Sequence, residues 1–451
     1  MEFQSINPYN QQVVATHQAQ TDAELFDTLE NAQVAFEEWR KVPVQERANL
    51  MFKAGQVLRE NVDEYAQMIT LEMGKPIVES RAEVNKCAWV CDYYAEHTAQ
   101  FLADEVIPTD AQKSFVRHEP IGPVWAIMPW NFPFWQVFRF AAPILMAGNT
   151  ALLKHAANVF GCAKQIENVF LKAGFPKGVF QNLFVDHDKT EAIIAHKAVK
   201  AVTLTGSERA GATVAALAGR YLKKSLLELG GSNAFIVWPD ADLDKAVQTA
   251  ITARMMNAGQ SCIAAKRFIL VEEIYDEFVA KFTAAVKQLK SGDPMDETTQ
   301  IGTLARKDLA DQLQRQVQLS LQQGAALLWG GYQKNAYHEP TILGNIKPGM
   351  PAFDQETFGP LAAMIRAKDI EEAFELAEMS NYGLGATICT TNIEKAVAMA
   401  DRVSDGAYFI NELVKSDPRL PFGGTKLSGY GRELAKEGMM EFINRKTVYV
   451  K

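Results

Sequence analysis

Three side chains of this sequence could together carry out acyl chemistry, and the first is a cysteine. Cys262 follows Asn257-Ala258-Gly259, which interrupts an apolar helical pattern that starts near Asp240. The apolar run Phe268–Val271 after it is typical of a buried strand. The pattern therefore predicts a loop between a helix and a strand, where a scaffold commonly presents a reactive thiolate. The alternative is a structural role, because most lone cysteines are small core residues.

The second and third side chains are a carboxylate and an amide in apolar surroundings. Glu228 stands in Leu227–Gly231, where removal from water would raise its pKa and suit it to act as a general base. It could equally be a partly buried structural glutamate. Asn131 lies in the rigid loop Pro129–Pro133 and could donate a hydrogen bond to a developing oxyanion. On its own it also fits an ordinary turn residue.

A possible anion site follows the strand predicted over Val199–Thr205. The chain turns there into a helix through Gly206 and Ser207, and backbone N–H groups at such a turn can face a pyrophosphate. The glycine spacing matches neither the dinucleotide fingerprint nor a P-loop. An ordinary strand-to-helix turn therefore remains an equal alternative.

Composition excludes several classes of function. The net charge is -8, with no block of Lys or Arg, which argues against nucleic acid or an anionic membrane as a partner. The seven histidines and five cysteines show no metal-ligand spacing and no disulfide framework, so we expect no metal and a reducing, cytoplasmic setting. The first eight residues lack the features of a secretion signal. Prolines interrupt the apolar stretch 123–153, which indicates a protein core and no membrane span.

The periodicity predicts an α/β fold with two doubly wound sheets. Residues 22–101 show helical patterns, and 113–120 looks like a strand with a charged side. From residue 122 onward, strand patterns alternate with helical ones, which is typical of parallel sheets. A second alternating set runs from about 234 to 410. The expected strands of the first set are 124–128, 150–154, 179–185 and 199–205, with helices near 138–146 and 158–173.

Together, these residues and several further motifs resemble the NAD(P)-dependent aldehyde dehydrogenase family over essentially the whole chain. The motifs occur in the order and at about the spacing that the family shows, which makes the likeness highly specific. They are Pro129–Pro133, Lys154, Thr205–Ser207, Glu228–Gly231, Gly259–Cys262, Glu356–Pro360 and Pro421–Gly424.

The resemblance implies a role for each of the three side chains. Cys262 would attack the aldehyde carbon to give a thiohemiacetal, and loss of a hydride to the nicotinamide would leave a thioester. The amide of Asn131 and the backbone N–H of Cys262 would hold the oxyanion. Glu228 would activate the water that hydrolyses the thioester.

The resemblance also implies a nicotinamide dinucleotide, NADP or NAD. Lys154 and Glu356 match positions that hold its ribose hydroxyls, and Phe358 matches the ring beside the nicotinamide ribose. The remaining cofactor positions are Trp130, Gly206, Ser207 and Ala157. Many NAD-preferring members carry a glutamate where this chain has Ala157. Without that carboxylate a 2′-phosphate meets no like charge, so we expect NADP to be accepted.

Within the family, the chain looks like the short succinate-semialdehyde dehydrogenase branch. Arg139 matches an arginine that binds the substrate's distal carboxylate, whereas a second arginine of some relatives is Met256 here. The carboxylate site is then incomplete, unless Lys415 or Ser416 completes it. The other expected substrate-binding residues are Trp135 and Ser261.

Three alternatives stay open beside succinate semialdehyde as the substrate. Aromatic residues such as Trp130, Phe134 and Trp135 would also suit a broad aliphatic or aromatic aldehyde dehydrogenase. A CoA-acylating relative is disfavoured because such enzymes often lack the glutamate at position 228. A non-catalytic protein of the same fold is disfavoured because Cys262, Glu228 and Asn131 are all present.

The resemblance implies three structural parts and an oligomer. The expected cofactor-binding domain comprises residues 1–103 and 121–230, and the catalytic domain comprises 231–431. Residues 104–120 and 432–451 form the expected oligomerisation extension, which crosses to a partner subunit in relatives. We therefore expect a homodimer or homotetramer that acts on a small-molecule aldehyde.

Overall fold

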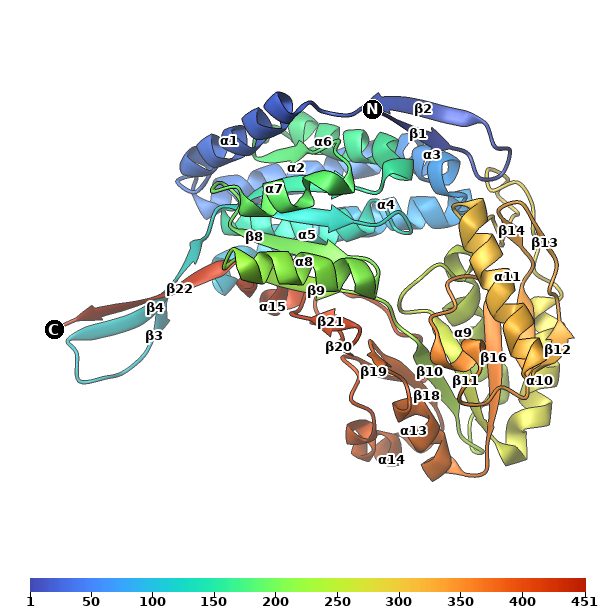
Figure 1. Ribbon diagram of the computed structural model, residues 1–451. Coiled ribbons are helices and arrows are strands. Elements are labelled where there is room, and N and C mark those ends of the chain that lie inside the picture. The colour runs from blue at the N-terminus through green and yellow to red at the C-terminus, as the bar shows by residue number, and fades with distance from the viewer.

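The computed structural model describes residues 1–451 and has two α/β lobes with a small sheet projecting from the first (Figure 1). Each lobe is built on a sheet with helices on both faces, which confirms the predicted pair of doubly wound sheets. Separate buried apolar clusters fill the two lobes. None of the helices has both the length and the apolar character that a membrane span needs.

The first lobe is organised around a six-stranded sheet with the order β21-β9-β8-β5-β6-β7. Its strands are parallel except for β21, and the chain order reverses between β5 and β8. Ligands of such sheets bind beyond the carboxyl ends of the strands at this reversal. The strands are β5 (Pro123–Met128), β6 (Thr150–His155), β7 (Phe180–Asn182), β8 (Ala201–Thr205), β9 (Lys224–Glu228) and β21 (Gly429–Tyr430).

Helices surround this sheet, and most of them lie where the sequence pattern predicts. The exception is α5, which begins at Trp135, three residues before the predicted start. The carboxylate of Glu83 accepts from the N–H groups of Phe134 and Trp135, at 2.9 and 3.0 Å, and so caps the earlier turn. The helices are α1 (Asp22–Trp39), α2 (Val44–Glu60), α3 (Val62–Met73), α4 (Ile77–Phe101), α5 (Trp135–Ala147), α6 (Phe160–Ala173), α7 (Thr190–Ala195), α8 (Glu208–Arg220) and α15 (Ala435–Met440).

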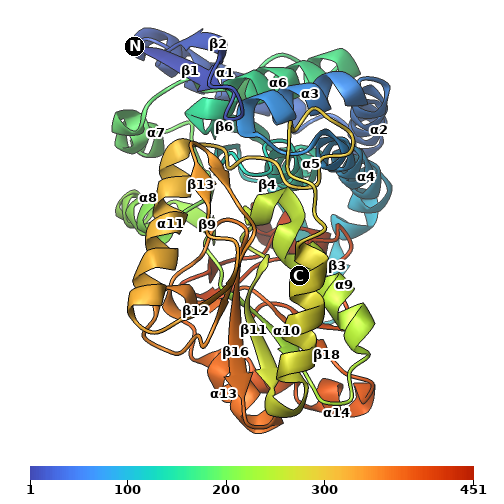
Figure 2. The same cartoon turned by 90° about the vertical axis from the view of Figure 1, so that its right-hand side faces the viewer.

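The second lobe contains a seven-stranded sheet with the order β12-β15-β16-β11-β10-β18-β19. Figure 2 shows α10 and α11 on its outer side. The strands are β10 (Asn233–Val237), β11 (Ala265–Val271), β12 (Ala326–Trp329), β15 (Thr341–Gly344), β16 (Leu361–Ala367), β18 (Ala386–Cys389) and β19 (Tyr408–Ile410). The helices are α9 (Leu243–Met255), α10 (Glu272–Val286), α11 (Lys307–Gln322), α12 (Pro351–Asp354), α13 (Ile370–Glu378) and α14 (Ile393–Ala398). Short strands β13 (Gln333–Lys334), β14 (Tyr337–His338), β17 (Tyr382–Gly383) and β20 (Thr425–Lys426) complete it.

The projecting sheet joins two distant parts of the chain, as the sequence predicts. Strand β22 (Ile443–Val450) pairs antiparallel with β4 (Lys113–Pro120) along its whole length, and β3 (Glu105–Val106) pairs with the other edge of β4. The sheet extends away from both lobes and carries the C-terminus (Figure 1). An N-terminal hairpin of β1 (Glu2–Ile6) and β2 (Val13–Gln18) lies outside the sequence prediction.

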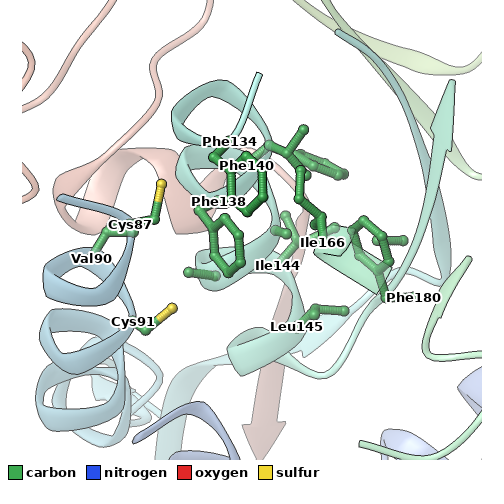
Figure 3. Close-up of a cluster of buried hydrophobic side chains, with 14 of the residues drawn as sticks. Cys87, Val90, Cys91, Phe134, Phe138, Phe140, Ile144, Leu145, Ile166 and Phe180 are labelled. Carbon is green, nitrogen blue, oxygen red and sulfur yellow. The ribbon is translucent and has the colours of Figure 1, made fainter. Parts of the chain in front are cut away.

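Apolar packing fixes α4 against α5, and both helices contribute to the site described below. Cys87 and Cys91 are fully buried on α4 and point toward Phe138 of α5 (Figure 3). Burial raises the pKa of both thiols, so they remain protonated core residues. Phe138 also stacks on Phe170 of α6, with ring centroids 5.2 Å apart. The neighbouring polar residues of α4 and α5 are thereby held in place.

Candidate active site

A cavity of about 620 Å³ lies where the two lobes meet. Its wall combines α4 and α5 of the first lobe with the cysteine loop and the segment Leu413–Ser416 of the second. Most of the lining surface is apolar. The thiol-bearing Cys262 and its neighbour Ser261 are both part of this wall.

The loop that carries Cys262 is held in an unusual backbone conformation. Asn257, Ala258 and Gly259 all have positive φ angles, of 53, 50 and 73°. A side chain at Gly259 would collide with the carbonyl of Gly359 and with Arg254, so only glycine fits there. These conformations end the helix before the cysteine, and they explain why the helical pattern breaks at these residues.

Two buried cations tie the cysteine loop to the segment that contains Glu356 and Phe358. Arg254 donates to the carbonyls of Gly259 and Thr357, at 3.0 and 3.1 Å. Lys266 donates to the carbonyl of Cys262 at 2.8 Å and to the Glu356 carboxylate at 3.2 Å. Each cation donates hydrogen bonds to both the cysteine loop and the segment of Glu356 and Phe358. The two segments are therefore held rigidly against each other.

The Cys262 thiol is protonated in this structure at neutral pH. Burial raises its pKa to about 11, although the nearby positive charges of Lys266 and Arg139 oppose the shift. The thiolate therefore has to be generated by proton transfer to a base. Glu228 is close enough for its own charge to raise the pKa of this thiol.

Asn131 is oriented for the predicted role of oxyanion donor. Its Oδ1 accepts from Gln136 at 2.9 Å, and its Nδ2 donates to the carbonyl of Gln260 at 3.1 Å. These bonds fix which side of the amide carries the hydrogens, and they leave one N–H of Nδ2 free. The backbone N–H of Cys262, two residues beyond Gln260, has no acceptor in the protein. The Asn131 amide and the backbone of Cys262 thus each keep one N–H without an acceptor in the protein.

Glu228 is the last residue of β9, and the structure buries it completely, more deeply than the sequence indicates. Neither carboxylate oxygen has a hydrogen-bond partner. Burial raises its pKa well above the usual range, and the nearby Glu433 raises it further, whereas Arg139 lowers it. A carboxylic acid of raised pKa next to a nucleophile is suited to accept and return protons near neutral pH.

Arg139 lines the cavity, but its positive charge is already balanced by a carboxylate. Its Nε forms a buried ion pair with the carboxylate of Glu433, and the guanidinium lies 4.7 Å from the Phe422 ring centroid. Its Nη2 reaches Thr205 Oγ1 at 3.4 Å. Sequence reasoning assigned no role to Glu433, which is the last residue of the glycine-rich stretch 421–433.

The predicted cofactor residues of the first lobe gather at the carboxyl ends of the central strands. Lys154 lies near the end of β6, is only 6% exposed and forms no ion pair or hydrogen bond through its ammonium group. Gly206 and Ser207 form the turn after β8, and the Ser207 hydroxyl caps α8 by accepting from Ala210 at 3.4 Å. Ala157 is half-buried just beyond β6. An unpaired buried cation at the sheet reversal fits an anionic or hydroxyl-rich ligand.

The second lobe supplies the opposite side of this region. Glu356 accepts from the N–H of Gly231 at 3.0 Å and from Lys266, so its carboxylate is fixed. The ring of Phe358 packs edge-to-face on Trp130 of the first lobe, with centroids 5.7 Å apart. Ala157 lies just beyond β6, and the other six predicted cofactor residues lie at strand ends and in loops of the two lobes. They are Trp130, Lys154, Gly206, Ser207, Glu356 and Phe358.

Comparison with known proteins gives the family. The model of the aldehyde dehydrogenase family matches residues 1–448. The chain belongs to the aldehyde dehydrogenase family. This agrees with the cysteine, carboxylate and amide that the structure places together.

Full-length relatives of this aldehyde dehydrogenase are named for one substrate. A probable succinate-semialdehyde dehydrogenase (NADP(+)) of Synechocystis is 48% identical over 453 residues, covering 100% of both chains. Succinate semialdehyde dehydrogenase (NAD(P)+) Sad of Escherichia coli is 48% identical and covers 99% of this chain and 97% of its own. The crystal structure of succinic semialdehyde dehydrogenase from Streptococcus pyogenes in complex with NADP+ superimposes with a TM-score of 0.97, at 40% identity over 99% of each chain.

The predicted substrate-binding residues of this aldehyde dehydrogenase differ in how they meet the cavity. Trp135 donates through its indole N–H to Ser416 Oγ at 2.9 Å, so both belong to one polar cluster on the wall. Lys415 also borders the cavity, but its ammonium group forms an ion pair with Glu412 at 2.9 Å and is about half exposed. A cation that sequence reasoning missed, Lys86 of α4, donates to the same Ser416 hydroxyl at 3.0 Å.

Proposed function

We propose that this aldehyde dehydrogenase oxidises succinate semialdehyde to succinate, with NADP as the preferred cofactor. The observation that carries the proposal is a cavity in which the Cys262 thiol shares one wall with Arg139 and Lys86. A substrate with an aldehyde at one end and a carboxylate at the other matches that distribution of groups. The names of the full-length relatives support the same substrate.

The catalytic steps follow from the surroundings of each group. The Cys262 thiol gives its proton to solvent water, and the resulting thiolate adds to the carbonyl carbon. The free N–H of Asn131 and the backbone N–H of Cys262 stabilise the negative charge that develops on the oxygen. After acylation, Glu228 takes a proton from water, and the hydroxide attacks the thioester and releases the acid. The apolar wall excludes other water from the reacting carbon.

The residues at the sheet reversal fit a nicotinamide dinucleotide. When bound there, the dinucleotide supplies the hydride acceptor. Lys154 and Glu356 would hold its ribose hydroxyls, the N–H groups of Gly206 and Ser207 would face the pyrophosphate, and Phe358 and Trp130 would flank the nicotinamide end. Ala157 presents no charge to a 2′-phosphate, which supports NADP.

Two further features belong to this proposal. The exposed sheet of β4 and β22 is suited to pair or pack with a second copy, so we propose a homodimer or homotetramer. All five cysteines are free, which fits a reducing compartment, and we place the enzyme in the cytoplasm.

Steady-state oxidation of succinate semialdehyde, hexanal and benzaldehyde with NADP tests the proposal. We expect kcat/KM to be highest for succinate semialdehyde by at least about tenfold, or 1.4 kcal/mol. Cys262→Ala serves as the control and should abolish the oxidation of all three. A higher kcat/KM for the neutral aldehydes would favour a broad-specificity enzyme, for which the mostly apolar cavity wall would be the explanation.

A further inference from the structure

Three cations line the cavity, and only one of them lacks a carboxylate partner. Arg139 is paired with Glu433, and Lys415 is paired with Glu412. The ammonium group of Lys86 has no carboxylate within ion-pair distance, although it lies on the wall of the cavity. We propose that Lys86, together with the hydroxyl of Ser416, binds the distal carboxylate of the substrate. This inference rests on the proposed function and names the group that determines its specificity.

The hydrogen bonds around Ser416 leave donors free for an anion. Lys86 Nζ and Trp135 Nε1 both donate to Ser416 Oγ, at 3.0 and 2.9 Å, and so occupy both lone pairs of that oxygen. The hydroxyl proton of Ser416 has no acceptor in the protein, and the ammonium group keeps two further N–H bonds. These free donors belong to adjacent groups on the cavity wall, which is the arrangement that a carboxylate needs.

The carboxylates near Lys86 are bound to other partners and do not neutralise its charge. Asp417 is engaged by Arg419 at 2.7 Å, and Glu83 is engaged by Lys75 and by two backbone N–H groups at the start of α5. Besides the hydrogen bond to Ser416, the ammonium group contacts the face of the Trp135 ring, whose centroid lies 4.1 Å from the nitrogen. A largely desolvated cation without a counter-ion is costly, and a bound carboxylate would supply the missing charge.

Met256, six residues before the cysteine, does not supply the charge that a carboxylate needs. Met256 lines the same cavity but is 38% exposed and carries no charge. Lys86 approaches from α4 of the opposite lobe, and the buried neighbour Cys87 anchors that turn of the helix (Figure 3). Lys86 and Ser416 thus supply the charge and the hydroxyl of the proposed carboxylate site.

Substitution of Lys86 tests the proposal through a ratio of two substrates. We compare kcat/KM for succinate semialdehyde with kcat/KM for butanal, which has the same chain length and no carboxylate. In Lys86→Met this ratio should fall at least about 30-fold. Lys86→Arg, which keeps the charge, should retain most of it. Lys53→Met removes an exposed, unpaired lysine of α2 and controls for the loss of one positive charge.

The outcomes separate this inference from the proposed function. A wild-type ratio near one would overturn both. A large wild-type ratio that Lys86→Met leaves unchanged would overturn the role of Lys86 alone. It would indicate that Arg139 binds the distal carboxylate of the substrate.

The pH dependence of the same ratio tests the proposal in the unmodified enzyme, so it does not depend on a variant that folds. Burial and the neighbouring Arg139 lower the pKa of Lys86 to about 8, against smaller opposing effects of Cys87 and Glu83 on α4 and of Asp417. Because kcat/KM reports the free enzyme, the ratio should fall as the pH rises through about 8. Titration of Cys262 changes kcat/KM for both substrates equally, so it does not change their ratio. A ratio that stays constant to about one unit above this pKa would contradict the proposal.

Discussion

Arg139 and Glu433 form an ion pair that is buried beside Glu228, the proposed general base. Two carboxylates and one arginine therefore share a dry region, and neither oxygen of Glu228 has a hydrogen-bond partner. The arginine lowers the pKa of both carboxylates, whereas the negative charge of Glu433 raises the pKa of Glu228. The ion pair thus adjusts the proton affinity of the base, in addition to any contact that Arg139 makes with substrate.

Arg139→Met should change the pH profile for a neutral aldehyde as well as for succinate semialdehyde. Without the cation, the pKa of Glu228 rises further, so the basic form needed for catalysis is reached at higher pH. The acid limb of kcat for butanal should shift upward. Arg139→Lys is the control and should restore much of the profile. A profile for butanal that does not move would show that Arg139 acts on the substrate's carboxylate alone.

Ala157→Glu should reverse the cofactor preference. The new carboxylate would lie where we place the adenosine ribose and would repel a 2′-phosphate. We expect kcat/KM for NADP to fall at least about tenfold, equivalent to 1.4 kcal/mol, relative to NAD. The uncharged Ala157→Gln separates charge from size. An equal loss in both variants would attribute the effect to steric crowding.

We predict that the folded protein loses stability in acid because of His155. Its Nε2 donates to the carbonyl of Pro133 at 2.9 Å, its Nδ1 accepts from the N–H of Ala156, and burial lowers its pKa from 6.5 to about 4. The neutral ring therefore stabilises the fold fully above about pH 6.5, and this contribution is lost as the pH falls toward 4. A shift of that size corresponds to about 3 kcal/mol.

Thermal unfolding of His155→Gln across this pH range measures the effect. The melting temperature of the variant should be lower than that of the wild type at neutral pH, and it should depend less on pH below 6.5. The matching His118→Gln, on the projecting sheet, should keep the wild-type pH dependence. The same slope in wild type and His155→Gln would contradict the assignment.

The sequence predicts most of the strands and helices that position the site, because the parallel strands are continuous apolar runs. The loop of Cys262 is equally predictable, since Asn257-Ala258-Gly259 interrupts a clear helical pattern. The early start of α5 is not predictable from local pattern. It depends on Glu83, which lies about fifty residues earlier in the sequence and caps the helix only in the folded chain.

The roles of the charged residues in the cavity also could not be predicted from local sequence pattern. Lys86 lies in a helix of mixed charge, and nothing in its spacing separates it from other charged residues of that helix, such as Arg81. Its role emerges only where Ser416, 330 residues away, meets it in space. In the same way, Glu433 is an ordinary acidic residue of a glycine-rich segment until the fold places it against Arg139.

The most direct test of the whole account is to trap the acylated enzyme. Glu228→Gln cannot accept a proton, and loss of its charge also removes one influence that raises the pKa of Cys262. Acylation should therefore proceed while hydrolysis slows by at least about 100-fold. After rapid mixing with NADP and succinate semialdehyde and an acid quench, mass spectrometry should find one succinyl group on the peptide that contains Cys262. The same peptide should be unmodified when NADP is omitted. Formation of NADPH without any modification of Cys262 would contradict the account.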